Sequence, residues 1–153
     1  MILYLDSSAL VKRYVREDGS ALVEAAIQAS GVVGTAQITR AEVGAALAKA
    51  ARLAVLSDRD ARSALAAALQ DWQMLVRVPL TDAVLGEAVE LAWAHGLRGY
   101  DAVQLASALA WRASLDEPVV FGAFDRTLAV AATACGLQPL PESLVVPPPD
   151  APS

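Results

Sequence analysis

Short apolar segments alternate with longer amphipathic segments along this chain. Residues 2–5, 32–35 and 118–121 are apolar runs with the length of buried strands. Elsewhere apolar residues recur with the three- to four-residue spacing of helices, which predicts helices over residues 7–15, 21–29, 39–55, 57–76, 81–95, 100–115 and 125–135. Residues 77–80 favour a short strand or a turn, and residues 137–140 a last short strand. Because parallel strands need helical connections, the pattern predicts an α/β fold with three α/β/α layers, a small central parallel sheet covered by helices on both faces.

The chain has the length of one domain with one core. We assign residues 1–146 to this domain and residues 147–153 to a Pro-rich tail. Hydrophobic residues make up 56% of the sequence, but no run of about 18 apolar residues is present, so we expect no membrane span. The N-terminus lacks the basic segment of a signal peptide, and we expect a cytoplasmic protein. Cys135 and His95 are the only residues of their kinds, which excludes a disulfide framework, a thiolate cage and any site that needs two imidazoles.

Four acidic residues lie where ligands bind in sheets of this kind, beyond the carboxyl ends of the strands. Asp6 directly follows the first predicted strand, and Asp125 follows the 118–121 strand after a short turn. Glu42 and Asp101 each lie in the first turn of a predicted helix. Asp101 also shares a helix face with apolar residues, and inward-facing acids are rare unless they are paired or bound to a metal.

Each acid also has an ordinary structural interpretation. Asp6 and Asp125 are suited to N-cap positions, and Asp101 to a helix dipole. Residues 39–42 form a complete capping-box motif that would use Glu42. All four acids nevertheless fall at the same end of the predicted sheet, where clustered carboxylates stay ionised together only if a cation neutralises them. The combination favours a metal site made of oxygen ligands, which suits Mg²⁺ or Mn²⁺.

The net charge of −5 argues mildly against a nucleic-acid partner, because phosphate binding depends on Lys and Arg. Basic residues are nevertheless placed near the acids. Lys12, Arg13 and Arg16 follow Asp6, and an arginine lies within three residues of each of the other three acids. These side chains are either phosphate contacts or ordinary solvated charges.

Four motifs, in order, resemble those of the PIN domain family. They are Asp6-Ser7-Ser8-Ala9-Leu10, Thr39-x-x-Glu42-Val43, Leu97-x-x-Tyr100-Asp101-Ala102-x-Gln104-Leu105-Ala106 and Phe124-Asp125-x-x-Leu128-x-x-Ala131-Ala132. The resemblance covers almost the whole chain, and within the family it is to VapC-type toxins of toxin–antitoxin pairs. It implies an endoribonuclease that needs Mg²⁺ or Mn²⁺, forms a homodimer and is inhibited by a small cognate antitoxin. One departure is Ala123, where many relatives have Ser or Thr.

The resemblance also implies roles for individual residues. Asp6, Glu42, Asp101 and Asp125 match the acidic quartet of the family, and Asp6 and Asp101 match its most constant metal ligands. We assign Glu42 and Asp125 to a second ion or to orienting the attacking water. Substrate-binding candidates are Ser7, which is equally suited to capping a helix, and the arginines Arg13, Arg98 and Arg126.

Other classes of protein fit the sequence less well. A phosphoaspartate enzyme or receiver domain also has an Asp after its first strand, but it needs a Lys late in the chain, and the last Lys here is Lys49. A dehalogenase-type enzyme needs a second acid at the position of Ser8. The alternative that stays open is a PIN-like domain that binds RNA or protein without cutting it. The Ala-rich segment 41–56 has more apolar residues than one packed face needs, which favours a homodimer.

Overall fold

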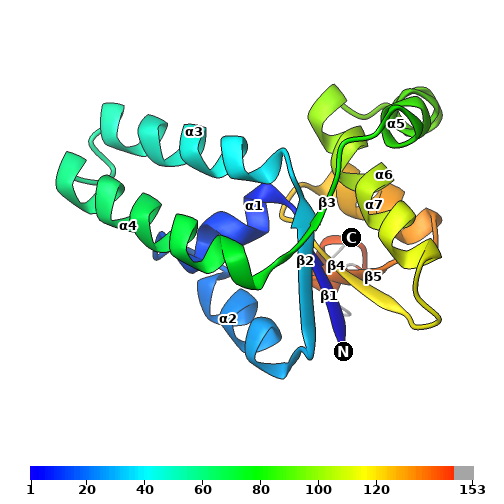
Figure 1. Ribbon diagram of the computed structural model, residues 1–153, viewed down its shortest axis with the longest axis horizontal. Helices are drawn as coiled ribbons and strands as arrows, with labels where there is room; N and C mark the ends of the chain where they lie inside the picture. Colours follow the sequence, from blue (N-terminus) through cyan, green and yellow to red (C-terminus); the bar gives the residue numbers. More distant parts are fainter. Residues whose placement is uncertain (147–153) are drawn as a thin grey trace, which may run out of the picture.

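The computed structural model describes residues 1–146 and has a five-stranded sheet whose paired strands all run parallel (Figure 1). The strand order is β3-β2-β1-β4-β5. The strands are β1 Ile2–Leu5, β2 Val32–Ala36, β3 Val76–Val78, β4 Val119–Gly122 and β5 Gln138–Leu140. The first strand of the sequence is therefore the central one, and its side chains Leu3, Tyr4 and Leu5 are fully buried.

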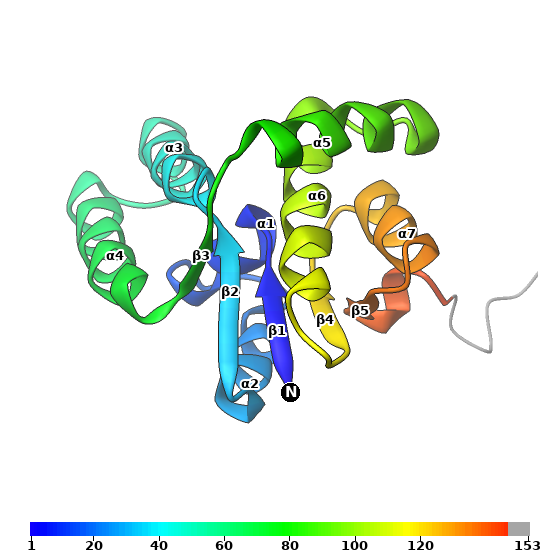
Figure 2. The same ribbon diagram turned by 45° about the vertical axis from the view of Figure 1, so that its right-hand side comes forward.

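Helices cover both faces of this sheet (Figure 2). They are α1 Ser7–Leu10, α2 Ser20–Ala29, α3 Thr39–Arg52, α4 Asp58–Asp71, α5 Asp82–His95, α6 Gly99–Ala113 and α7 Arg126–Ala134. Side chains of a strand alternate between faces, so Leu3 and Leu5 pack against α1 to α4, whereas Tyr4 packs against α5 to α7. The predicted three-layer α/β/α architecture is confirmed.

Several helix boundaries differ from those that the sequence predicts. The helix predicted over residues 7–15 is divided into α1 and a 3-10 helix, Val11–Arg13. The helix predicted to reach residue 55 ends at Arg52, because Ala54 adopts a left-handed conformation with φ 55° and Val55 N–H turns back to the Ala50 carbonyl. Glycine is the usual residue at such an ending, and its absence here hides the end of the helix in the sequence.

Other predicted boundaries are confirmed by their caps. Ser57 and Thr81 accept hydrogen bonds from the backbone N–H groups of Asp60 and Val84, and Gly96 ends α5 with φ 64°. Helix α6 lies close to the sheet because Gly34 has no side chain; a Cβ there would lie 2.5 Å from the Trp111 ring. Among the described helices none has the length and apolarity to cross a bilayer. The predicted Pro-rich tail, residues 147–153, lies outside the described residues.

Candidate active site

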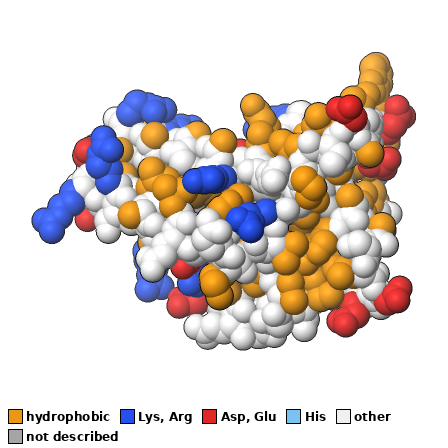
Figure 3. Space-filling view, viewed as in Figure 1, with side chains coloured by type: hydrophobic (Ala, Val, Ile, Leu, Met, Phe, Trp, Pro, Cys, Tyr) orange, Lys and Arg blue, Asp and Glu red, His pale blue; other side chains and the backbone are white. Residues whose placement is uncertain are grey.

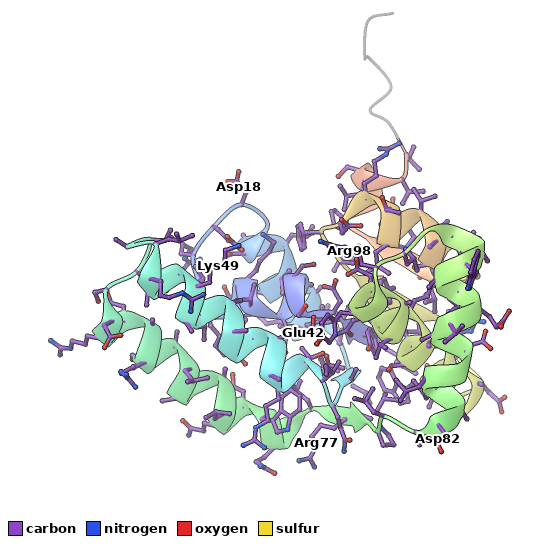
Figure 4. All side chains as sticks on the ribbon, turned by 90° about the horizontal axis from the view of Figure 1, so that it is seen from above. Asp18, Glu42, Lys49, Arg77, Asp82 and Arg98 are labelled. Carbon is purple, nitrogen blue, oxygen red and sulfur yellow. The ribbon has the colours of Figure 1, made fainter. Side chains whose placement is uncertain are left out.

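The four predicted acids come from four separate elements at the carboxyl end of the sheet. Asp6 lies between β1 and α1, Glu42 in the first turn of α3, Asp101 in the first turn of α6, and Asp125 immediately before α7. The charges of Glu42 and Asp101 act directly on Asp6, and Arg98 connects Asp101 with Asp125. The fold therefore brings together acids that lie up to 119 positions apart in the sequence. In Figure 4, which looks at the molecule from above, Glu42 and Arg98 lie near its middle.

Asp6 is the buried centre of this group, with 3% of its surface exposed. Its Oδ1 accepts hydrogen bonds from the Ala9 N–H (2.8 Å) and the Ser8 hydroxyl (2.7 Å), so Asp6 is the N-cap of α1, as one interpretation of the sequence predicted. Its Oδ2 accepts none from the described residues. Burial, helped by the negative charges of Glu42 and Asp101, raises the pKa of Asp6 to about 7, although its two hydrogen bonds lower the pKa. An N-cap role alone does not explain why an acid is buried beside two other negative charges.

Glu42 has no capping role, so the capping-box interpretation is wrong. The helix begins one residue earlier than that motif requires: Ile38 is the N-cap residue, its carbonyl accepts the Glu42 N–H, and Thr39 is already helical. The Glu42 carboxylate instead turns toward the other elements of the site. Its Oε2 accepts the Ser7 hydroxyl (2.8 Å) and its Oε1 accepts the Gln104 amide N–H (2.7 Å). Ser7, one of the substrate-binding candidates, is thus a partner of Glu42.

Asp101 and Asp125 share one arginine. The Asp101 side chain is 19% exposed, and its Oδ2 accepts a hydrogen bond of 3.0 Å from Arg98 Nε, while its Oδ1 accepts none in the described part of the chain. Asp125 caps α7 through the Leu128 N–H (2.9 Å), and its Oδ2 lies 3.9 Å from Arg98 Nη2. The Arg98 side chain is 80% exposed, so it is a cation at the solvent edge of the acids.

The other two candidate arginines contact different parts of the protein. Arg13 forms an ion pair of 2.8 Å with Asp71 of α4. Arg126 donates to the Leu144 carbonyl at 2.8 Å. Neither forms an ion pair with one of the four acids among the described residues. Of the three arginines, Arg98 is the one that the fold brings to the acidic group.

Two polar residues of the site had no role predicted from the sequence. The Ser8 hydroxyl donates to Asp6 and accepts the Phe124 N–H (3.0 Å), and so links α1 to the loop before α7. Gln104 is 1% exposed and contacts Glu42 from α6. A glutamine among the apolar residues of a helix, three positions after Asp101, is the sequence signal that indicates an inward polar contact.

The chemistry of these residues fits a hard divalent cation. All four acids offer oxygen, and the carboxylate oxygens of this group without a hydrogen bond in residues 1–146 are Asp6 Oδ2, Asp101 Oδ1 and Asp125 Oδ2. The raised pKa of Asp6 reflects a surplus of negative charge that a cation would relieve. Within residues 1–146, no three or more His, Cys, Asp or Glu side chains are placed around a common point that could hold one ion. The carboxylates of Glu42 and Asp101 are instead hydrogen-bonded to Ser7, Gln104 and Arg98.

Comparison with known proteins gives a consistent result. Residues 3–133 match the sequence profile of the PIN domain. The chain is 40% identical over 147 residues to Ribonuclease VapC45 of Mycobacterium tuberculosis, covering 94% of this chain and 97% of that one. PAE2754 from Pyrobaculum aerophilum has a similar structure, with a TM-score of 0.67, 23% identity and coverage of 95% of this chain and 88% of that one.

A toxin–antitoxin complex from Klebsiella pneumoniae also has a similar fold, with a TM-score of 0.54, 17% identity and coverage of 80% of this chain and 86% of that one. Identities this low show the shared fold only. The family match and the 40% identity to VapC45 confirm the resemblance of the four motifs. The chain belongs to the PIN domain family and is similar to its VapC-type toxins.

Proposed function

We propose that this protein is a metal-dependent endoribonuclease and the toxin of a toxin–antitoxin pair. The observation that supports this most directly is the buried Asp6, whose pKa is raised to about 7 at the end of the central strand beside Glu42 and Asp101. A buried carboxylate with a raised pKa beside other acids, at the ligand-binding end of a parallel sheet, is typical of a functional site. The similarity to a protein named as a ribonuclease supports RNA as the substrate.

In this proposal Asp6 and Asp101 hold Mg²⁺ or Mn²⁺ through Oδ2 and Oδ1, which accept no hydrogen bond in the described chain. When bound, such an ion activates water and neutralises the phosphodiester oxygens. Glu42, fixed by its hydrogen bonds, either orients the attacking water as an acceptor or helps to bind a second ion. Asp125, which shares Arg98 with Asp101, has the same two alternative roles.

Arg98 is the arginine that we assign to the RNA phosphate. Its guanidinium is exposed and contacts two carboxylates that a metal would neutralise, so metal binding weakens its hold on Asp101 and leaves its donors for a phosphate. Arg13 and Arg126 donate to Asp71 and to the Leu144 carbonyl and form no ion pair with the four acids in the described residues, so we do not assign them to the phosphate.

The distribution of charge on the surface is compatible with an RNA partner despite the net charge of −5. Figure 3 shows Lys and Arg gathered over α3 and α4, and Asp and Glu gathered at the opposite end, over α5 and the loop before β4. The exposed basic residues of α3 and α4 include Lys49, Arg52, Arg59 and Arg62. Asp58 and Asp60 also lie on α4, so the charges of α3 and α4 nearly balance, and the acidic surplus lies over α5 and the loop before β4.

Apolar surface supports the proposed protein partners. The sequence suggested the Ala-rich segment 41–56 as the homodimer surface; we assign it instead to α5, whose exposed side chains include Val89 at 55% and Trp93 at 86%, a face that suits a second copy of the chain. Between α3 and α4 lies a groove lined by Leu47, Ala48 and Leu65, which suits an apolar segment of an antitoxin. We place this homodimer and its antitoxin in the cytoplasm.

The alternative is an inactive PIN domain that binds RNA or protein, and one observation favours it: the acids in the described residues are not arranged around one ion. A cleavage assay separates the two functions. The purified protein, free of antitoxin, is incubated with a labelled structured RNA in Mn²⁺ or in EDTA. Our proposal predicts internal cleavage in Mn²⁺ only. RNA that is retained on a filter but stays intact in Mn²⁺ would support the binding module.

A further inference from the structure

Gln104 is buried at the point where α6, β1 and α3 meet. It is 1% exposed and lies one turn after Asp101 on α6. Its side-chain amide does not titrate. Because the amide is buried, its oxygen and its nitrogen each need hydrogen-bond partners. Its partners come from both other elements, which makes it a link between the central strand and the acidic site.

The hydrogen bonds of Gln104 fix the orientation of its amide. Its Oε1 accepts the Tyr4 hydroxyl at 2.7 Å, and its Nε2 donates both of its protons, to Thr39 Oγ1 at 2.8 Å and to Glu42 Oε1 at 2.7 Å. A carboxylate can only accept, so the NH₂ group must face Glu42. The Tyr4 ring that fixes the other end stacks on Phe121 with a centroid distance of 5.4 Å.

A chain of hydrogen bonds also connects Gln104 to the end of β1. Gln104 Nε2 donates to Thr39, the Thr39 hydroxyl lies 2.8 Å from the Thr35 hydroxyl, and the Thr35 hydroxyl donates to the Leu5 carbonyl at 2.7 Å. Leu5 is the residue immediately before Asp6. The network therefore relates the position of Glu42 to the backbone that positions Asp6.

From these contacts we infer that Gln104 is a positioning residue of the active site: its amide, whose orientation is fixed by Tyr4 and Thr39, holds the Glu42 carboxylate in place. The inference rests on the proposed function, because it concerns the working orientation of Glu42. Glu42 has two hydrogen-bond donors, Ser7 on Oε2 and Gln104 on Oε1, and only Gln104 is itself held on its far side. A carboxylate held at both oxygens loses less freedom when it takes its place beside an ion or a water.

The test is a double-mutant cycle on Gln104 and Glu42, read by Mn²⁺ affinity in calorimetry and by single-turnover RNA cleavage. Gln104→Met has nearly the same shape but cannot donate, and we expect it to weaken Mn²⁺ binding or slow cleavage by about 10- to 100-fold, the usual effect of losing an outer partner. In the Glu42→Ala background the same substitution should change both quantities less than about threefold. A purely structural role would instead reduce both quantities equally in the two backgrounds.

Two further variants keep the test decisive. Tyr4→Phe removes the hydrogen bond that holds Gln104 Oε1 and should change the same quantities in the same direction, severalfold, even if Gln104→Met does not fold. Leu105→Met is the matched control, because it places the same Met side chain at a fully buried position of the same helix that contributes no side-chain hydrogen bond to the network; it should behave as wild type.

The outcomes distinguish this inference from the proposed function. Wild-type affinity and rates in both Gln104→Met and Tyr4→Phe, in a wild type that binds Mn²⁺ and cuts RNA, would overturn the role of Gln104 alone. A wild type that neither binds Mn²⁺ nor cuts RNA would overturn the proposed function, and the positioning role with it.

Discussion

The buried carboxyl group of Asp6 makes the stability of the metal-free protein depend on pH in a way that one substitution should abolish. Burial, with the charges of Glu42 and Asp101, raises the pKa of Asp6 from 3.8 to about 7. Each unit corresponds to about 1.4 kcal/mol, so the shift amounts to a few kcal/mol, on the order of 4. The unfolded chain ionises at the lower pKa. The contribution of Asp6 to stability is therefore greatest below pH 4, falls as pH rises from there through the folded value near 7, and is constant above it.

Asp6→Asn removes this dependence with little change in shape. The Asn carbonyl still accepts the Ala9 N–H and the Ser8 hydroxyl, so the cap of α1 is retained. Without metal, the variant should be less stable than or equal to wild type at pH 4 and more stable by a few kcal/mol at pH 8, on the order of the shift above.

Urea unfolding in EDTA at fixed ionic strength, from pH 4 to pH 8, measures the difference. Other acids titrate in the same range, but they are common to both proteins, so the difference between the two curves isolates Asp6. Parallel curves for wild type and Asp6→Asn would refute the argument that the fold holds Asp6 against its charge.

Three further predictions concern the metal, the RNA and the oligomer. Mn²⁺ should raise the melting temperature of wild type and raise that of Asp101→Asn much less, because the variant has lost one ligand; equal shifts in thermal melts would exclude Asp101 as a ligand. Arg98→Gln should bind Mn²⁺ more tightly in calorimetry, since a competing cation is removed, while its KM for RNA rises; an unchanged KM would exclude the phosphate contact. Trp93→Lys should turn a dimer into a monomer in light scattering, because it charges the exposed apolar face of α5, whereas a wild type that is already a monomer would contradict the dimer.

The sequence predicted the sheet and the placement of the acids because both depend on local signals. Apolar runs as short as residues 2–5 have few alternatives to a buried strand, and an acid directly after such a run must lie at its carboxyl end. Where the signal was missing, the prediction failed. The end of α3 was placed at residue 55 because Ala54 takes the left-handed conformation that usually marks a Gly.

Side-chain contacts between residues far apart in the chain could not be predicted from the sequence. The capping-box motif at Thr39 and Glu42 satisfies every local rule, yet Ile38 begins the helix and both side chains bond elsewhere. Glu42 accepts a hydrogen bond from Gln104, 62 positions away, instead of capping its own helix, and the spacing of residues along the chain does not reveal this contact. The same limit applies to Arg98, whose proximity to Asp125 arises only in the folded protein.

The central claim, that these carboxylates form the active site of a metal-dependent ribonuclease, is tested most directly by one comparison. Single-turnover cleavage of a labelled RNA in Mn²⁺ is measured for wild type and for Asp6→Asn, after unfolding curves have shown that both are folded. We predict that wild type cuts in Mn²⁺ and stops in EDTA, and that Asp6→Asn is slower by more than the roughly 100-fold that loss of an outer partner can cause. Cleavage by Asp6→Asn at the wild-type rate would contradict the claim.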